Sequence, residues 1–222
     1  MTTNCSIIVV DDFYDNPDQV RKAALASRFK TYSQGPYSYR SAKPKNYLVQ
    51  DALERIIPII GQDYRGKFIE SQFIAETKQD EIRSKKKSWV HFDRSRWVGV
   101  LYLSLPQHCQ GGTSFFLHKN TGFTRWEELL KYTLQGHGRP RDIFKDSTDL
   151  RKWDVISSIG MIYNRLLLFD SRMFHQATSY FGTNLSNCRL YHHFAFDEVT
   201  DEELSVTLSN SSLHTKKETN DG

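Results

Sequence analysis

The spacing of hydrophobic and polar residues predicts a chain made mostly of short strands, with helices concentrated near the N-terminus. The longer apolar run at 161–178 predicts two strands that are broken at Asp170 and Ser171. Other short apolar or alternating runs, bounded by turn-forming residues, predict strands over residues 5–13, 67–78, 89–105, 111–118 and 188–196. The pattern therefore favours a protein that is mainly β.

Helical spacing of apolar residues occurs in three places and predicts helices over residues 15–29, 50–61 and 125–135. The first of these has Asn16 as its expected N-cap and Pro17 at its first helical position. The residues at 31–46 are rich in Ser, Pro and Tyr and predict a loop instead. We expect this loop, with its tyrosines, to flank the mouth of a pocket.

Short strands linked by turns, with few helices between them, are typical of an antiparallel sandwich or barrel, including the jelly roll. The strands at 89–105 and 111–118 are joined through "PQHCQGG" and predict a hairpin. We expect a single domain over residues 1–200, with an N-terminal α/β segment at about 1–80 and a jelly-roll core at about 81–200.

Composition narrows the classes of function. The chain has 222 residues and is 38% hydrophobic, which suffices for a substantial core, while the polar residues 201–222 predict a flexible tail. The net charge of +4 comes from interspersed charges, which argues against nucleic-acid binding. Three cysteines without a CxxC pair predict a reducing, cytoplasmic location. No run approaches the ~20 apolar residues that span a bilayer, and no signal peptide is evident, so we expect no membrane association.

The stretch "WVHFDRSRWVGVLYLSL" at 89–105 contains the first candidate chemistry. On a strand, side chains at i and i+2 point to the same face, so His91 and Asp93 would lie side by side. They could form a surface ion pair worth less than about 1 kcal/mol, or two-thirds of a metal site. A two-histidine, one-carboxylate iron site needs one more histidine on a facing strand. His175, in the strand-like run "DSRMFHQAT", is the candidate.

The other histidines rank below His175 as a third ligand because they lie in connections, at a strand end, on the last strand or in the tail. His118 stays open as a ligand, and His192 or His193 stays open as a group that orients a ligand. The lower-ranked set comprises His108, His118, His137, His192, His193 and His214.

An arginine in the last predicted strand suggests an anion site. Arg189 lies in the apolar run "CRLYHHFAF", and a guanidinium buried there needs an anion. The fork-shaped guanidinium matches the geometry of a carboxylate. Tyr102, on the strand that follows Asp93, could donate a second hydrogen bond to the same carboxylate. The alternatives are a structural salt bridge from Arg189 to Asp170 or Asp197 and simple core packing of Tyr102.

Taken in order, these pieces resemble the non-haem Fe(II), 2-oxoglutarate-dependent dioxygenase superfamily, in its prolyl-hydroxylase-like branch. The opening "VVDDFYDNPDQVRKAAL" at 9–25 also resembles the start of many such domains. The other matching pieces are "HFD" at 91–93, "GVLYLSLP" at 99–106, "GGTSFF" at 111–116, "NRLLLFDSRMFHQAT" at 164–178 and "CRLYHHFAF" at 188–196.

The resemblance implies a double-stranded β-helix, a distorted, cupin-like jelly roll packed on N-terminal helices. It makes His91, Asp93 and His175 the Fe(II) ligands, with Arg189 and Tyr102 on the distal carboxylate of 2-oxoglutarate. Retention of Asp93 favours oxygenation over halogenation.

The implied reaction uses O2 to convert 2-oxoglutarate to succinate and CO2 while a C–H bond is hydroxylated. A small molecule, an amino acid or a peptide fits equally as substrate, and the oligomeric state has no signature in the sequence. Two alternatives remain: a cupin-like metal protein with another chemistry, such as an isomerase or thiol dioxygenase, and a non-catalytic binding module.

Overall fold

A computed structural model describes residues 6–34, 37–60, 66–84 and 89–198 of the chain. The large sheet is antiparallel, in the order β1 (Ile7–Val10), β8 (Leu166–Asp170), β5 (Trp97–Tyr102), β10 (Arg189–Glu198), β4 (Gly66–Glu76), β3 (Tyr37–Ala42) and β2 (Lys30–Gln34). A smaller antiparallel sheet has the order β7 (Trp153–Gly160), β6 (Gly112–His118) and β9 (His175–Ala177). The prediction of a mainly β protein is confirmed.

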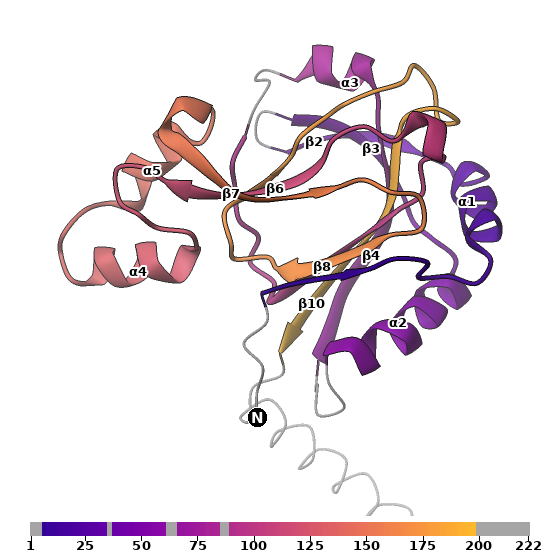
Figure 1. The fold of residues 1–222 in the computed structure, drawn as a ribbon, viewed down its shortest axis with the longest axis horizontal. Helices are drawn as coiled ribbons and strands as arrows, with labels where there is room; N and C mark the ends of the chain where they lie inside the picture. Colours follow the sequence, from indigo (N-terminus) through magenta and orange to yellow (C-terminus); the bar gives the residue numbers. More distant parts are fainter. Residues whose placement is uncertain (1–5, 35–36, 61–65, 85–88, 199–222) are drawn as a thin grey trace, which may run out of the picture.

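The helices lie at the periphery of the sheets. Figure 1 shows α1 and α2 together on one side of the molecule, while α4, α5 and β7 project on the other. The helical elements are α1 (Pro17–Leu25), α2 (Asn46–Ile60), α3 (Lys78–Arg83), α4 (Trp126–Leu134) and α5 (Pro140–Asp146), with short 3-10 turns η1 (Pro106–His108) and η2 (Leu150–Lys152). Within the described ranges, no helix is long and apolar enough to cross a membrane.

Alternation along the strands of the large sheet separates two cores, because successive side chains point to opposite faces. On β10, Leu190 and Phe194 pack with residues of α1 and α2. Tyr191 and Ala195, on the other face of the same strand, pack with Phe115 of the small sheet. The space between the two sheets is therefore lined by one face of each central strand, and this is where the candidate chemistry gathers.

Most of the predicted elements are present. The helices predicted at 15–29 and 125–135 correspond to α1 and α4, and Pro17 is the first residue of α1. The run at 161–178 is divided into β8 and β9, with the break after Asp170 as predicted. The strands predicted at 67–78, 111–118 and 188–196 correspond to β4, β6 and β10. These are the segments with the longest regular patterns.

Three predictions about local structure are wrong. The predicted loop at 31–46 forms the hairpin of β2 and β3, whose tyrosines and serines face each other across the ladder. The predicted hairpin of 89–105 and 111–118 does not form, since β5 pairs with β8 and β10 while β6 pairs with β7 and β9. The predicted strand at 89–105 begins only at Trp97. The predicted tail at 201–222 lies outside the described residues.

Candidate metal centre

The two candidate histidines are placed by a single backbone bridge. Residues 89–96 run without regular strand structure, apart from an isolated antiparallel bridge between His91 and His175. The His91 amide donates to the His175 carbonyl at 3.0 Å, and the His175 amide donates to the His91 carbonyl at 2.8 Å. Residues directly opposite in an antiparallel bridge present their side chains on the same face. The two imidazole rings accordingly lie with their centroids 4.5 Å apart.

Backbone carbonyls determine which nitrogen of each ring is available for a metal. Nδ1 of His91 lies 2.9 Å from the Trp89 carbonyl, and Nδ1 of His175 lies 2.8 Å from the Met173 carbonyl. A carbonyl oxygen only accepts, so Nδ1 is the protonated donor in both rings. In the neutral form of either ring the lone pair is then on Nε2, the atom that a metal would bind. The two histidines are thus arranged alike, as a pair of Nε2 ligands.

Asp93 completes the cluster from the same irregular segment. Its Oδ2 lies 3.4 Å from Nε2 of His175, and one ligand atom from each of His91, Asp93 and His175 lies within 4.8 Å of the others. Burial lowers the pKa of His91 to about 4, assisted by the nearby His175. Burial raises the pKa of Asp93, but the hydrogen bond and charge of His175 outweigh this and lower it below its usual range. At neutral pH the cluster therefore offers a neutral His91 ring and a carboxylate.

The cluster opens into a cavity of about 360 Å³ between the two sheets, within the usual size range for small-ligand sites. The aromatic ring of Trp89 stacks on His91 at 4.6 Å, and Tyr37 stacks on Tyr180 at 5.7 Å near the same cavity. The central strands contribute the side chains of one face each: Glu70, Gln72, Ile74 and Glu76 from β4, and Arg189, Tyr191, His193 and Ala195 from β10.

Arg189 lies in this cavity as expected, but its acidic partner is neither Asp170 nor Asp197. Its Nε lies 3.0 Å from Oε2 of Glu76, which stands directly opposite on β4. The guanidinium carbon lies 5.5 Å from the ring centroid of Tyr102. Tyr102 is buried, and its hydroxyl hydrogen-bonds Oγ1 of Thr113 at 3.0 Å. The structure thus brings Arg189 and Tyr102 together, with Tyr102 as the surface on which the guanidinium rests.

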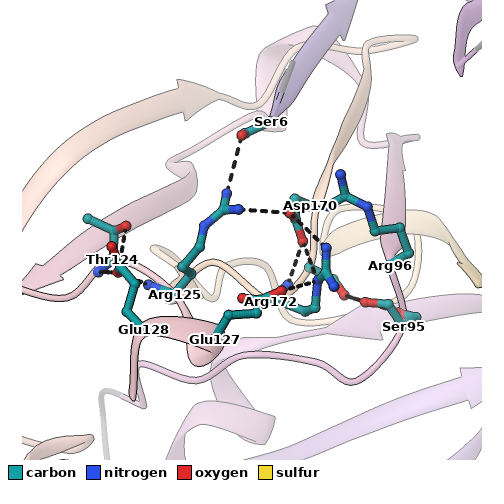
Figure 2. Close-up of polar contacts among 10 residues, drawn as sticks. Ser6, Ser95, Arg96, Thr124, Arg125, Glu127, Glu128, Asp170 and Arg172 are labelled. Carbon is teal, nitrogen blue, oxygen red and sulfur yellow. Dashed lines mark hydrogen bonds and ion pairs between the residues drawn. The ribbon is translucent and has the colours of Figure 1, made fainter. Parts of the chain in front are cut away.

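An arginine cluster supports the loop between β8 and the candidate metal ligand His175 on β9. In Figure 2, three guanidinium groups point at the Asp170 carboxylate, which is 1% exposed; they belong to Arg96, Arg125 and Arg172. Arg172 also pairs with Glu127 at 2.7 Å. The carbonyl of Ser171, the residue that follows Asp170, accepts a hydrogen bond from the Asp93 amide at 2.8 Å. The cluster therefore anchors the backbone on which Asp93 and His175 depend.

The segment that contains the candidate metal ligands His91 and Asp93 is supported by the region at 119–160. The Val90 amide donates to the Ser147 carbonyl at 2.7 Å. Phe92 stacks on Trp126 of α4 with a centroid separation of 4.6 Å and also lies near Phe144 of α5. These contacts restrain residues 89–96, which lack the ladder of a regular strand, from the side away from the large sheet.

A model of a family of unknown function, DUF6445, matches residues 1–187 of the chain. The chain belongs to this family. No curated protein matches it.

Solved structures with a similar fold include enzymes. The non-heme alpha ketoglutarate dependent epimerase SnoN, from nogalamycin biosynthesis, is 12% identical with a TM-score of 0.53 over 88% of this chain and 79% of its own. The carbocyclase SnoK of the same biosynthesis is 13% identical with a TM-score of 0.52, over 90% and 85%. HygX from Streptomyces hygroscopicus, solved with nickel, 2-oxoglutarate and hygromycin B, is 14% identical with a TM-score of 0.51, over 87% and 83%. The DUF6445 chain thus has the fold of non-heme 2-oxoglutarate enzymes.

Among the other histidines of the DUF6445 chain, the described part of the structure separates those near the site from those remote from it. His193 lines the cavity, with Nδ1 3.7 Å from Glu70, whereas His192 points to the opposite face and hydrogen-bonds Ser71 at 2.6 Å. His118 hydrogen-bonds Thr121 and Asp146 away from the cavity. The alternation of side chains along β10 could have told His192 from His193, because positions 189 and 193 lie on the same face of a strand and position 192 on the other.

Sequence reasoning missed Glu76 and the position of Trp89. Glu76 ends the near-alternating run "SQFIAE", where its parity matches that of Ile74 on the cavity face. This alternation was the sequence signal that could have placed Glu76 on the cavity face. Trp89 lines the cavity against His91 because residues 89–96 are not in a strand.

Proposed function

We propose that this DUF6445 protein is an Fe(II)- and 2-oxoglutarate-dependent oxygenase of the prolyl-hydroxylase-like branch, with a double-stranded β-helix fold. Its reaction would hydroxylate a C–H bond of a small molecule, an amino acid or a peptide, releasing succinate and CO2. The observation that carries the proposal is the convergence of His91, Asp93 and His175 in the cavity that also contains Arg189.

The residues present fit a divalent iron ion. Two Nε2 lone pairs and one carboxylate, held within 4.8 Å of one another, form the two-histidine, one-carboxylate set that leaves coordination positions open for other ligands. The hydrogen bonds from Nδ1 to carbonyls orient both rings without the metal, so the site is organised in advance. When bound, Fe(II) would supply the activation of O2 that the protein's own side chains lack.

The residues present also fit the dicarboxylate. Arg189 is 2% exposed, and its Nη1 has no hydrogen-bond partner among the described residues. A buried donor without a partner is costly, so this atom favours a ligand oxygen. Arg189 would hold the distal carboxylate of 2-oxoglutarate while the aromatic walls of the cavity exclude water.

Two of the cysteines, Cys109 and Cys188, are free thiols, which supports the proposed cytoplasmic location.

The first experiment measures metal and co-substrate chemistry before any substrate is known. Wild-type protein loaded anaerobically with Fe(II) and then exposed to O2 is expected to convert 2-oxoglutarate to succinate. His175→Ala is expected to lose both tight Ni(II) binding in calorimetry and succinate formation. Arg189→Ala is expected to keep Ni(II) binding but to require a higher 2-oxoglutarate concentration. The matched control is His137→Ala, which removes an exposed histidine of the loop after α4 and should leave both readouts unchanged.

Folded wild-type protein that binds neither Ni(II) nor Fe(II) would reject the proposal and return the cluster to an ordinary ion pair. Metal binding of equal strength in wild type and His175→Ala would also reject it, because the metal would then lie elsewhere.

A further inference from the structure

Glu76 places a negative charge beside the guanidinium of Arg189, the cationic group that the proposed function assigns to the co-substrate. It faces Arg189 directly across the β4–β10 ladder, and the two side chains are 6% and 2% exposed. With Oε2 3.0 Å from Nε, the carboxylate already balances the guanidinium charge inside the cavity. A second carboxylate bound to Arg189 would leave this buried site with one uncompensated negative charge, which is costly in a poorly hydrated site.

The surroundings of Glu76 favour the protonated acid as the way to remove that charge. Burial raises the pKa of Glu76 to about 7, with the charge of Arg189 opposing the rise. The Tyr191 hydroxyl donates to Oε1 at 3.4 Å. The titratable and charged groups that act on Glu76 or feel its charge come from four elements: Arg189 and Tyr191 on β10, Asp80 on α3, Tyr37 and Tyr39 on β3, and Tyr180 and Cys188 in the connection before β10.

Asp80 is itself engaged, because its Oδ2 lies 3.3 Å from Arg40. The tyrosines and the Cys188 thiol have pKa values raised by burial and stay neutral. Among these groups, Glu76 is therefore the carboxyl that touches Arg189 and can change its charge near neutral pH.

We propose that Glu76 is a co-substrate-binding residue that takes up one proton when the distal carboxylate of 2-oxoglutarate binds Arg189. This inference rests on the proposed function. The Arg189–Glu76 pair changes from a net charge of zero, with Glu76 anionic, to +1, with Glu76 neutral, and the bound carboxylate then returns the net charge of the site to zero. The proton comes from solvent, and the neutral acid can then donate a hydrogen bond where its anion could only accept.

Glu70 provides a matched comparison on the same strand. It has the same parity as Glu76 and lines the same cavity, but its side chain is 44% exposed and its neighbour is His193, at 3.7 Å. Its carboxylate keeps its hydration and has no contact with the arginine. Glu70→Gln removes the same charge from the same face of β4 without touching Arg189.

The test is calorimetric titration of 2-oxoglutarate into the Ni(II)-loaded, full-length protein at pH 6, 7 and 8, in paired buffers of different ionisation enthalpy. This measurement counts protons bound per ligand and does not depend on turnover. At pH 8 wild type should take up close to one proton, and at pH 6 close to none, because Glu76 is then protonated beforehand. Linkage predicts an affinity that falls by up to about tenfold per pH unit above pH 7.

Glu76→Gln should bind 2-oxoglutarate about tenfold more tightly than wild type at pH 8, without the proton uptake, whereas Glu70→Gln should keep the proton uptake of wild type. Wild-type binding at pH 8 without proton uptake, or equal uptake in Glu76→Gln, would overturn the inference while leaving the proposed function standing. The wild-type proton count decides the matter even if Glu76→Gln does not fold. Ni(II)-loaded wild type and Glu76→Gln that both fail to bind 2-oxoglutarate would reject the proposed function and the inference together.

Discussion

Replacing Asp170 by asparagine tests whether the arginine cluster of Figure 2 stabilises the fold. The substitution keeps the shape of the side chain but removes the charge that Arg96, Arg125 and Arg172 share. Nε of Arg172 and Nη1 of Arg125 lie 3.1 and 3.4 Å from the carboxylate. At an effective dielectric constant of about 20, each such contact has a Coulomb energy of about 5 kcal/mol before desolvation is counted.

The net effect is smaller because the three arginines retain some hydration. Their side chains are 21%, 30% and 29% exposed, and Arg172 keeps its pair with Glu127. Removal of one member of a buried ion pair costs about 3–5 kcal/mol, and the partial exposure places this site near the lower limit. We expect Asp170→Asn to lower the free energy of unfolding by about 3 kcal/mol, which for a chain of this size lowers Tm by about 6–12 °C.

Thermal unfolding of the metal-free protein, followed by circular dichroism, measures this effect without a contribution from the metal site. The matched control is Asp149→Asn, which removes a half-buried carboxylate paired with the exposed Arg151 and should leave Tm unchanged. Burial raises the pKa of Asp170, but the hydrogen bond from Arg172 and the charge of Arg96 lower it overall.

The stabilisation by Asp170 should therefore persist above its unfolded pKa of about 3.9 and decline as the pH falls through the lower folded value. A Tm for Asp170→Asn within about 1 °C of wild type at pH 7 would refute the reasoning and indicate that solvent already compensates the arginines.

Two further substitutions test the packing of the sheets by thermal unfolding. Gly112→Ala should destabilise the protein by about 1–3 kcal/mol, because the added Cβ would lie 1.9 Å from the Ile159 carbonyl oxygen. The control is Gly160→Ala, which lies directly opposite in the ladder and whose Cβ would have no atom within 4 Å. Equal destabilisation by the two substitutions would contradict the prediction. Leu168→Ala, at a fully buried position, should cost about 2–5 kcal/mol, whereas Val155→Ala, 59% exposed, should cost less than about 0.5 kcal/mol.

The sequence predicted the parts of the fold that depend on local pattern. The apolar run of β8 and the break after Asp170 follow from residue types alone, and α1 follows from Pro17 and the spacing of its alanines. The hairpin of β2 and β3 could not be predicted in this way, because its strand "YSYRSA" becomes a strand through pairing with β4. Such pairing depends on residues far away in the chain.

The candidate site shows the same division. His91, Asp93 and His175 were selected by residue type and order, and the structure brings their ligand atoms together. The reason given for the first two was wrong, since they share no regular strand and instead depend on one bridge to His175 and one hydrogen bond to Ser171. Glu76 was missed because its role depends on the register of β4 against β10, which no local pattern specifies.

Strand β10 has an evolutionary consequence. Arg189, Tyr191 and His193 face the cavity, while Leu190 and Phe194 face the core under the helices. Because the two sets alternate, inserting or deleting one residue within Arg189–Glu198 would exchange the ligand-binding and core-forming positions beyond that point. We therefore expect natural length variation near this strand to fall in the preceding connection at 178–188, where a change of length leaves the alternation intact. Within β10, homologues should differ by substitution alone.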